Sequence, residues 1–327
     1  RSTDQNNGHA SLDGGHAAHL QACARRSADA SLGGHVGTAG NRSIEGGTRR
    51  TRVVLVSRVK RNPYVALLCE GLKQPDLRCE PRMVDRFSLG WMWQNRHQID
   101  VLHVHWLELL FVYPTLARSI KRWLSVMLGF CLARAMGVCL VYTVHNIQHH
   151  EGQRPNLYRW ANRMVFALAQ GIHVHDTETA RVLAQSWHRR RRVHVIPHGN
   201  YSLVYGNTAT RAEARQRLGL DEKAFVYLSL GRVRPYKGIE ELLAAFRALS
   251  SPDAVLIVAG EVHDIGYDHT LRALAGDDSR IRLHLEYVPD EELQLYLNSC
   301  DLCVLPYRQV TTSGAAILAF SFAIPII

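Results

Sequence analysis

The sequence predicts an α/β protein with two domains, each built on a parallel β-sheet. Short apolar runs rich in Val, Ile and Leu alternate with amphipathic segments from about residue 52 to the C-terminal end. This alternation has the spacing of βαβ units, which form parallel sheets with right-handed crossovers. The 327 residues suffice for two separate cores, and a short polar stretch at 202–210 divides the pattern into two halves.

The charge balance favours a partner that carries negative charge. The chain contains 39 Lys and Arg against 29 Asp and Glu, a net charge of +10 with His neutral. Such an excess suits a phosphorylated substrate, nucleic acid or an anionic membrane surface. The seven cysteines are odd in number and scattered, which predicts a reducing compartment, the cytoplasm. No run of about eighteen apolar residues is present, so no transmembrane helix is expected.

Residues 1–50 are predicted to be a disordered tail. They are rich in Gly, Ala, Ser, His and Asn and show no apolar periodicity. Such a segment buries too little apolar surface to offset the entropy lost on ordering. Weak metal binding by its histidines is an alternative to a tail without function (His9, His16, His19 and His35).

The first domain is predicted over residues 51–205. Its helices follow from apolar periodicity, and one of them starts at Asn62-Pro63, with Asn62 as N-cap and Pro63 as first helical residue. The strands are expected at 52–57, 99–104, 138–144, 171–174 and 193–196, and the other helices at 118–136, 158–169 and 177–187.

The second domain is predicted over residues 206–327. Its strands are expected at 225–230, 255–259, 281–285 and 302–305, and its helices at 211–218, from 239 onward, and at 269–275, 290–299 and 315–322. The chain stops at Pro325-Ile326-Ile327, an apolar run like the opening of another strand. We therefore expect a fragment without its C-terminal part. Two Rossmann-like domains are the simplest architecture that fits both halves.

One loop of the second domain combines features of an anion site. Gly231 ends a buried strand, and Arg232, Arg234 and Lys237 follow before an amphipathic helix begins at Ile239. Ligands of open α/β sheets bind at the carboxyl ends of strands, where helix N-termini also favour anions. The loop therefore suits a phosphate, and a solvated basic turn is the alternative.

Polar residues at strand ends recur in both halves of the chain. Because the carboxyl ends of parallel strands lie at one edge of a sheet, two such domains that face each other are expected to form a cleft. In the first domain the candidates for the acceptor side of this cleft are Asn62, Tyr64, His105, Trp106, Glu108 and Asn146. A packing role is the alternative for Trp106.

These motifs together resemble the GT-B glycosyltransferases, in particular the retaining GT4 family. The likeness spans residue 52 to the end. It rests on Gly231-Arg232 followed by Lys237-Gly238, on His145-Asn146 after a strand, and on further short motifs in the family's order: Ile196-Pro197-His198-Gly199, Val288-Pro289-Asp290-Glu291-Glu292-Leu293, Cys300-Asp301-Leu302 and Leu305-Pro306-Tyr307.

The resemblance implies a transfer of sugar from a nucleotide diphosphate donor, UDP- or GDP-linked, to a saccharide or lipid-linked acceptor. Arg232 and Lys237 would bind the diphosphate, and His145 would contact the transferred sugar. Fixed cations at the leaving group stabilise the charge that grows in the transition state and replace a divalent metal. No other cofactor is implied, and retention of configuration follows from the resemblance alone. The other donor-binding candidates are Gly231, Glu261, Thr312, Ser313 and Gly314.

The chain departs from the GT4 pattern at two positions. The family usually carries two glutamates eight positions apart before its last strand, and Val310 and Leu318 stand there instead. Thr311-Thr312-Ser313-Gly314 offers hydroxyl and backbone N–H groups near them. A sugar-nucleotide-binding relative without catalysis is therefore an alternative function.

Other motifs support weaker hypotheses. The pairs His103/His105 and His173/His175 could chelate zinc, but the spacing supplies no third ligand. Cys300 and Cys303 have redox spacing, although buried structural thiols are the favoured interpretation. The run 189–192 of four arginines could bind nucleic acid, a second alternative function. The basic amphipathic segment 118–136 could touch the inner face of a membrane, as could the basic first half of the chain as a whole.

Overall fold

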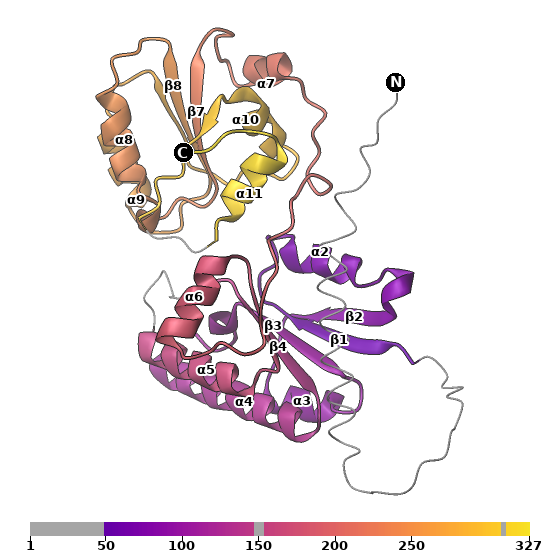
Figure 1. Cartoon of the computed structure of the whole chain (residues 1–327). Coiled ribbons are helices and arrows are strands. Elements are labelled where there is room, and N and C mark those ends of the chain that lie inside the picture. Colours follow the sequence, from indigo (N-terminus) through magenta and orange to yellow (C-terminus); the bar gives the residue numbers. More distant parts are fainter. Residues whose placement is uncertain (1–48, 147–153, 309–311) are drawn as a thin grey trace, which may run out of the picture. The chain divides into compact units, whose positions relative to one another are not determined.

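The computed structural model describes residues 49–146, 154–308 and 312–327, and the chain divides into two compact units, Arg1–Pro197 and His198–Ile327 (Figure 1). We predicted the division between residues 205 and 206. It lies earlier because the expected linker packs on the second unit. Tyr201 is 3% exposed and its backbone N–H donates to Ser321 Oγ at 2.8 Å. The N–H of Ala209 donates to Gln294 Oε1 at 2.9 Å.

The predicted disordered tail and its histidines lie outside the described residues, apart from Arg49 and Arg50.

The first unit holds a six-stranded, fully parallel sheet in the order β2-β1-β3-β4-β5-β6. Val54 and Val56 of β1 pack into one apolar cluster with α4 and α5, while Val53 and Leu55 pack into another with α2. Helices therefore cover both faces of the sheet. The elements are β1 (Thr51–Val56), α2 (Tyr64–Gly71), η1 (Pro75–Leu77), β2 (Cys79–Val84), α3 (Leu89–Asn95), β3 (Val101–His105), η2 (Leu107–Leu110), α4 (Leu116–Ala135), β4 (Cys139–Val144), α5 (Pro155–Leu168), β5 (Gly171–Val174), α6 (Thr177–Ser186) and β6 (Val193–Val195).

Two elements of this unit escaped the sequence prediction. Strand β2 is an edge strand that contains Pro81 and leaves three of its six side chains exposed, so it lacks the apolar pattern of a central strand. Helix α3 is short, and Met92 is its only fully buried residue. The start of α2 was also one residue off. Pro63 is its N-cap, and Asn62 Oδ1 accepts the N–H of Tyr64 at 2.9 Å.

The second unit holds a four-stranded parallel sheet in the order β10-β7-β8-β9. Its cores lie on both faces, one with α10 and one with α8 and α9. The terminal run 325–327 pairs beside β10, where Ile326 forms a parallel bridge with Cys303, as its strand-like sequence predicted. The elements are α7 (Arg211–Arg217), β7 (Phe225–Leu230), η3 (Pro235–Lys237), α8 (Ile239–Arg247), β8 (Ala254–Ala259), α9 (Tyr267–Ala275), β9 (Ile281–His284), α10 (Leu293–Ser299), β10 (Leu302–Cys303) and α11 (Gly314–Ser321).

Candidate active site

A cluster of aromatic and imidazole rings lies at the carboxyl ends of β3 and β4. The indole of Trp106 stacks on the imidazole of His145, with centroids 3.9 Å apart and planes 7° from parallel. His105 Nδ1 lies 3.1 Å from His145 Nε2. Tyr64, at the start of α2, places its ring edge-on to His145 at 5.0 Å. Four of the predicted residues are thus brought together.

The parallel strands explain this convergence. In the register of the sheet, His105 at the end of β3 pairs with Thr143 of β4, so His145 emerges two residues later at the same edge. Trp106 adopts a left-handed conformation with φ 44° and ψ 62°. Few non-glycine residues adopt this conformation, and it turns the chain sharply at the end of β3, where Trp106 stacks on His145.

The hydrogen bond between the two imidazoles restricts their protonation. One nitrogen must donate and the other must accept, so His105 and His145 cannot both be imidazolium while the contact persists. A neutral imidazole can accept a proton or a hydroxyl hydrogen bond.

His175 completes the cluster, and the sequence indicated it only as half of a possible zinc-chelating pair. It lies just after β5, with its ring 5.2 Å from that of His145 and 5.3 Å from that of Tyr64. Burial lowers its pKa, which keeps it neutral near pH 7. The recurrent pattern of a polar residue after a strand could have found it, because His175 follows β5 as His145 follows β4.

The remaining acceptor candidates have different surroundings. Asn62 precedes the N-cap of α2, and its Oδ1 accepts the N–H of Tyr64. Glu108 is buried in η2, where its carboxylate raises the pKa of the Tyr158 phenol together with burial, the larger cause. The carbonyl of Asn146 accepts the Tyr158 hydroxyl at 2.7 Å. The adjoining His149-His150-Glu151 lies outside the described residues.

In the second unit, glycines allow close contact between the loops after β7, β8 and β10. A Cβ on Gly260, which has φ 144°, would lie 2.1 Å from the carbonyl oxygen of Gly231. A Cβ on Gly238, with φ 69°, would lie 2.1 Å from the carbonyl oxygen of Pro306. Both positions therefore require glycine, and the three loops form one surface at the carboxyl edge of the sheet.

Two cations meet on this surface. Lys237 Nζ lies 5.1 Å from the ring centroid of Tyr307 and beside Gly231, where a Cβ would be 3.3 Å away. Burial and the neighbouring Arg232 and Arg234 lower the pKa of Lys237 to about 8. Arg234 is paired with Asp264 at 3.0 Å. In the described part of the chain no carboxylate pairs with Arg232 or Lys237, so an anion can bind between them.

The other donor candidates border this surface. Glu261 follows Gly260 and lies 3.1 Å from His263 Nε2. Ser313 caps α11, where its hydroxyl accepts the N–H of Ala316 at 3.2 Å, and Thr312 and Gly314 flank it. Tyr307, which the sequence marks only as the end of the motif Leu305-Pro306-Tyr307, contacts both Lys237 and Ser313. It lies under Lys237, and its pKa is raised to about 12 by burial, although a hydrogen bond from Ser313 opposes this.

The structure explains one of the missing glutamates. Leu318, on α11, packs against the apolar cluster with Leu228, Leu293 and Phe322, so this position contributes to the core. Val310 lies outside the described residues.

Several other predictions can be compared with the structure. Cys300 and Cys303 are buried structural thiols as expected, and burial raises their pKa values to about 12 and about 11. Arg189 donates to the carbonyl of Ala169 at 2.9 Å, so one arginine of the basic run supports a turn.

Within residues 49–146, 154–308 and 312–327, no group of three or more His, Cys, Asp or Glu is placed to hold a metal. No helix in these ranges has the length and apolar character needed to cross a bilayer.

Comparison with known proteins identifies the second unit. Residues 210–327 match the family model described as glycosyl transferases group 1. The second unit is a group 1 glycosyltransferase domain. The chain is also 29% identical over 266 residues to GDP-mannose:glycolipid 4-beta-D-mannosyltransferase of Xanthomonas campestris pv. campestris, covering 81% of this chain and 69% of that relative. It is 26% identical to D-inositol 3-phosphate glycosyltransferase 1 of Catenulispora acidiphila, covering 82% of this chain and 66% of that relative.

Solved structures share the two-domain glycosyltransferase fold. HepE of Anabaena, in complex with UDP-glucose, aligns with a TM-score of 0.62 at 16% identity, covering 85% of this chain and 80% of that one. Sucrose-phosphate synthase of Thermosynechococcus elongatus aligns with a TM-score of 0.63 at 18% identity over the same shares. With its two parallel-sheet units, the chain has a fold of the GT-B type, and its similarity to these relatives supports the GT4-like glycosyltransferase that its motifs predicted.

Proposed function

We propose that this glycosyltransferase moves a hexose from a nucleotide diphosphate sugar to a glycolipid acceptor, and that GDP-mannose is the first donor to test. Two cations of the second unit carry the proposal, Arg232 and Lys237, which pair with no carboxylate among the described residues. A diphosphate supplies the negative charge that this loop lacks, and charge-assisted hydrogen bonds from both side chains can bind it. The name of the Xanthomonas relative suggests GDP-mannose as the donor and a glycolipid as the acceptor.

In the proposed step, an acceptor hydroxyl oxygen forms a bond to C1 of the sugar while the bond from C1 to the β-phosphate oxygen breaks. The electron pair leaves with the nucleoside diphosphate, and with attack on the same face the hydroxyl proton passes to the departing phosphate oxygen. Arg232 and Lys237 stabilise the charge that grows on this oxygen. Because these two cations supply the positive charge, we propose that no divalent metal is needed.

The first unit would provide the sugar and acceptor contacts. The imidazoles of His105, His145 and His175 gather beside the aromatic rings of Trp106 and Tyr64. Sugars bind well to such surfaces, because aromatic faces contact C–H groups while imidazoles bind hydroxyls. We therefore place the transferred sugar and the acceptor at this cluster, with His145 as the side chain that contacts the reacting sugar.

The stereochemistry of the product is open to a direct test. We retain the proposal that configuration at C1 is kept, which rests on the resemblance to GT4 enzymes. The Xanthomonas relative is named a 4-beta-D-mannosyltransferase. If this chain converts an α-linked donor into a β-linked product, the proposal of retention must be replaced by inversion. The C1–H1 coupling constant of the product, measured by NMR, distinguishes these outcomes.

Donor binding and turnover test the proposal. A thermal-shift screen of GDP-mannose, UDP-glucose and other nucleotide sugars should give one stabilising donor. Arg232→Ala and Lys237→Ala should each weaken its binding at least about tenfold, since a hydrogen bond to a charged group contributes about 1.5–3 kcal/mol. Lys223→Ala, an exposed change elsewhere on the second unit, should not. Unchanged affinity in both loop variants would exclude the proposed donor site.

The core position of Leu318 keeps a second function under consideration, a sugar-nucleotide-binding protein without catalysis. Donor binding that responds to Arg232→Ala, without sugar transfer or donor hydrolysis on any glycolipid acceptor, would support it. A nucleic-acid-binding protein would instead lose affinity steeply with salt and be unaffected by Arg232→Ala.

A further inference from the structure

The part of the first unit that the structure describes has an exposed apolar face on helix α4. Four residues of α4 follow one another at intervals of four positions, Leu116, Ile120, Leu124 and Leu128, with exposed fractions of 50%, 40%, 48% and 51%. This interval places them along one side of the helix. On the opposite side of the helix, Val126 and Phe130 are buried in the core, so α4 is apolar on both sides.

Two further helices extend this face. The N–H of Leu89, which begins α3, donates to Ser125 Oγ at 3.3 Å, and a Cβ on Gly129 would touch the Phe87 ring at 2.9 Å. Trp123 Nε1 donates to the carbonyl of Leu157 on α5 at 3.1 Å. The three helices therefore form one surface, to which α3 adds Trp93 (56% exposed) and α5 adds Trp160 (57%).

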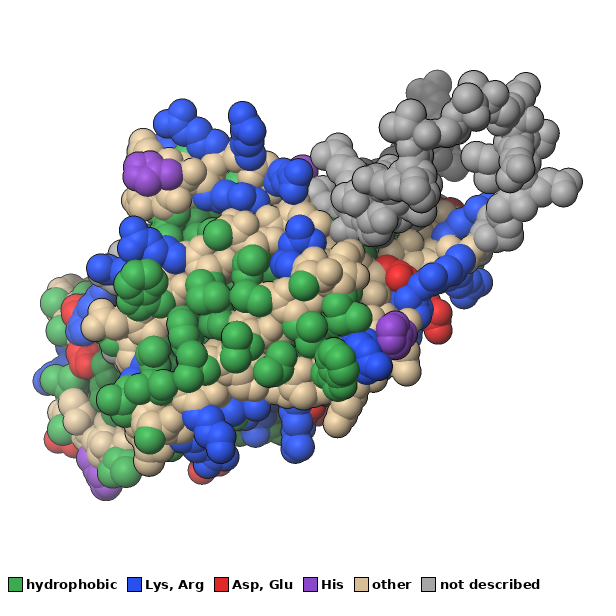
Figure 2. All heavy atoms as spheres, turned by 90° about the horizontal axis from the view of Figure 1, so that it is seen from below, with side chains coloured by type: hydrophobic (Ala, Val, Ile, Leu, Met, Phe, Trp, Pro, Cys, Tyr) green, Lys and Arg blue, Asp and Glu red, His purple; other side chains and the backbone are tan. Residues whose placement is uncertain are grey.

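The charges on this surface have one sign. Helices α3, α4 and α5 contain no Asp or Glu. Lys and Arg surround the apolar side chains, as Figure 2 shows. The Arg96 guanidinium lies 4.3 Å from the Trp93 ring centroid, and that of Arg163 lies 5.7 Å from Trp160. Exposed Trp beside Arg is typical of side chains that sit at the boundary between lipid tails and headgroups.

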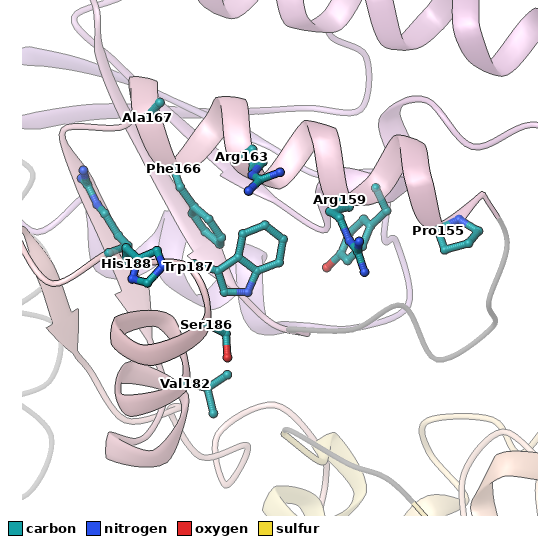
Figure 3. A pocket seen from close by; sticks show the side chains of 11 residues that line it. Pro155, Arg159, Arg163, Phe166, Ala167, Val182, Ser186, Trp187 and His188 are labelled. Atoms are coloured by element: carbon teal, nitrogen blue, oxygen red, sulfur yellow. The ribbon is translucent and has the colours of Figure 1, made fainter.

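A basic groove adjoins the face on the far side of α5. It lies between α5 and α6 and is lined by Arg159, Arg163, Trp187, His188 and Arg189, among others (Figure 3). Trp187 packs edge-on against Phe166, at 5.2 Å between centroids, which fixes the apolar floor. The groove offers cations without acidic lining residues, as a phosphate headgroup requires.

We propose that the face formed by α3, α4 and α5 docks on an anionic membrane surface, with the leucine stripe of α4 in the acyl boundary and the cations among the headgroups. Exposed apolar side chains beside Lys and Arg, on three helices that contain no Asp or Glu, match this partner. A second copy of the chain fits less well, because two-fold pairing of this face would bring its cations against one another. This inference is independent of the donor site.

Vesicle co-sedimentation of the full chain, without donor, tests the proposal. Binding is expected to phosphatidylcholine vesicles that contain phosphatidylglycerol, and it should weaken in high salt and on pure phosphatidylcholine. The double variant Leu124→Glu/Leu128→Glu should lose at least about tenfold in partitioning. These side chains are already exposed, so the variant should fold. Ile265→Glu, on a fully exposed side chain of the second unit, should bind as the wild type does.

The charge contribution is tested separately. Lys121→Ala and Arg159→Ala should each reduce binding to anionic vesicles about fivefold, whereas Lys223→Ala should not. Absence of vesicle binding, or equal binding by the Leu124→Glu/Leu128→Glu variant, would overturn the proposal. The proposal would also be overturned if sedimentation velocity showed a wild-type dimer and the Leu124→Glu/Leu128→Glu variant were monomeric, because a second copy would then cover the face. Donor affinity of these variants, measured in parallel, should be unchanged.

Discussion

The indole of Trp106 and the imidazole of His145 stack with their ring centroids 3.9 Å apart, although 38 residues lie between them in the chain. The stack fixes the plane of the imidazole, and the contact with His105 Nδ1 fixes its rotation within that plane. Both restraints come from side chains of the same unit. His145 is thus held in one orientation before any ligand binds.

Replacing Trp106 should impair transfer without affecting the donor diphosphate site. We expect Trp106→Ala to lower kcat/KM for the acceptor about tenfold or more, since an aromatic pair contributes about 0.5–1.5 kcal/mol beyond its buried area and positioning errors add to this. Trp106→Phe keeps a ring face and should recover much of the loss. Affinity for the nucleoside diphosphate, measured by calorimetry, should not change. A large loss of that affinity would show that Trp106 does not act through the sugar or acceptor.

Donor binding should depend on the protonation of Lys237. Burial and its cationic neighbours lower its pKa to about 8, so the free protein loses the ammonium as pH rises through that value. A diphosphate favours the charged form and raises this pKa on binding. Donor affinity should therefore be constant below about pH 7 and fall by up to about tenfold per pH unit above 8. Lys237→Arg should remove this decline, because the guanidinium stays charged; a decline that persists would assign the titration to another group.

Gly238 should tolerate no side chain. Its φ of 69° disfavours other residues, and a Cβ would lie 2.1 Å from the carbonyl oxygen of Pro306. We expect Gly238→Ala to destabilise the second unit by about 2 kcal/mol and to weaken donor binding, because it separates the loops that carry Lys237 and Tyr307. Gly206→Ala is the matched control, since its nearest neighbour would be 3.9 Å away. Equal melting temperatures for the two variants would contradict this geometry.

A buried ion pair should control the stability of the second unit. Arg215, whose side chain is 2% exposed, donates to Asp301 Oδ2 at 2.9 Å, and Asp301 also accepts the N–H of Val226. Asp301→Ala leaves the buried guanidinium without its carboxylate, which should cost about 3–5 kcal/mol. Asp278→Ala, which removes a more exposed pair with Arg280, should cost less than about 1 kcal/mol.

The tryptophans make this prediction specific to one unit. All six lie in the first unit, at positions 91, 93, 106, 123, 160 and 187. Urea unfolding of Asp301→Ala should therefore shift the circular dichroism transition but leave the tryptophan fluorescence transition close to that of the wild type. A matching shift in fluorescence would mean that the two units unfold together.

The sequence by itself determined the alternation of strands and helices and the chemistry of the strand ends. Buried parallel strands have near-continuous apolar sequences, so β4 and β7 were readable without a structure. The spacing of Gly231, Arg232 and Lys237 predicted an anion loop, with a solvated basic turn as the alternative, because the loop lies between a strand and a helix at the carboxyl edge of the sheet. Edge strand β2 was missed since it is half-exposed and contains Pro81, so no apolar pattern marks it.

Only the tertiary structure decided which side chains meet. The register of β3 against β4 brings Trp106 onto His145, and β5 adds His175, a relationship that depends on sheet order and not on sequence spacing. That no carboxylate within the described ranges pairs with Lys237 is likewise a matter of distance, as is the packing of Leu318 into the core. The exposure of the leucine stripe on α4 was likewise decided by tertiary packing. Its periodicity was visible in the sequence, but which side of the helix faces the sheet depends on the residues packed against it.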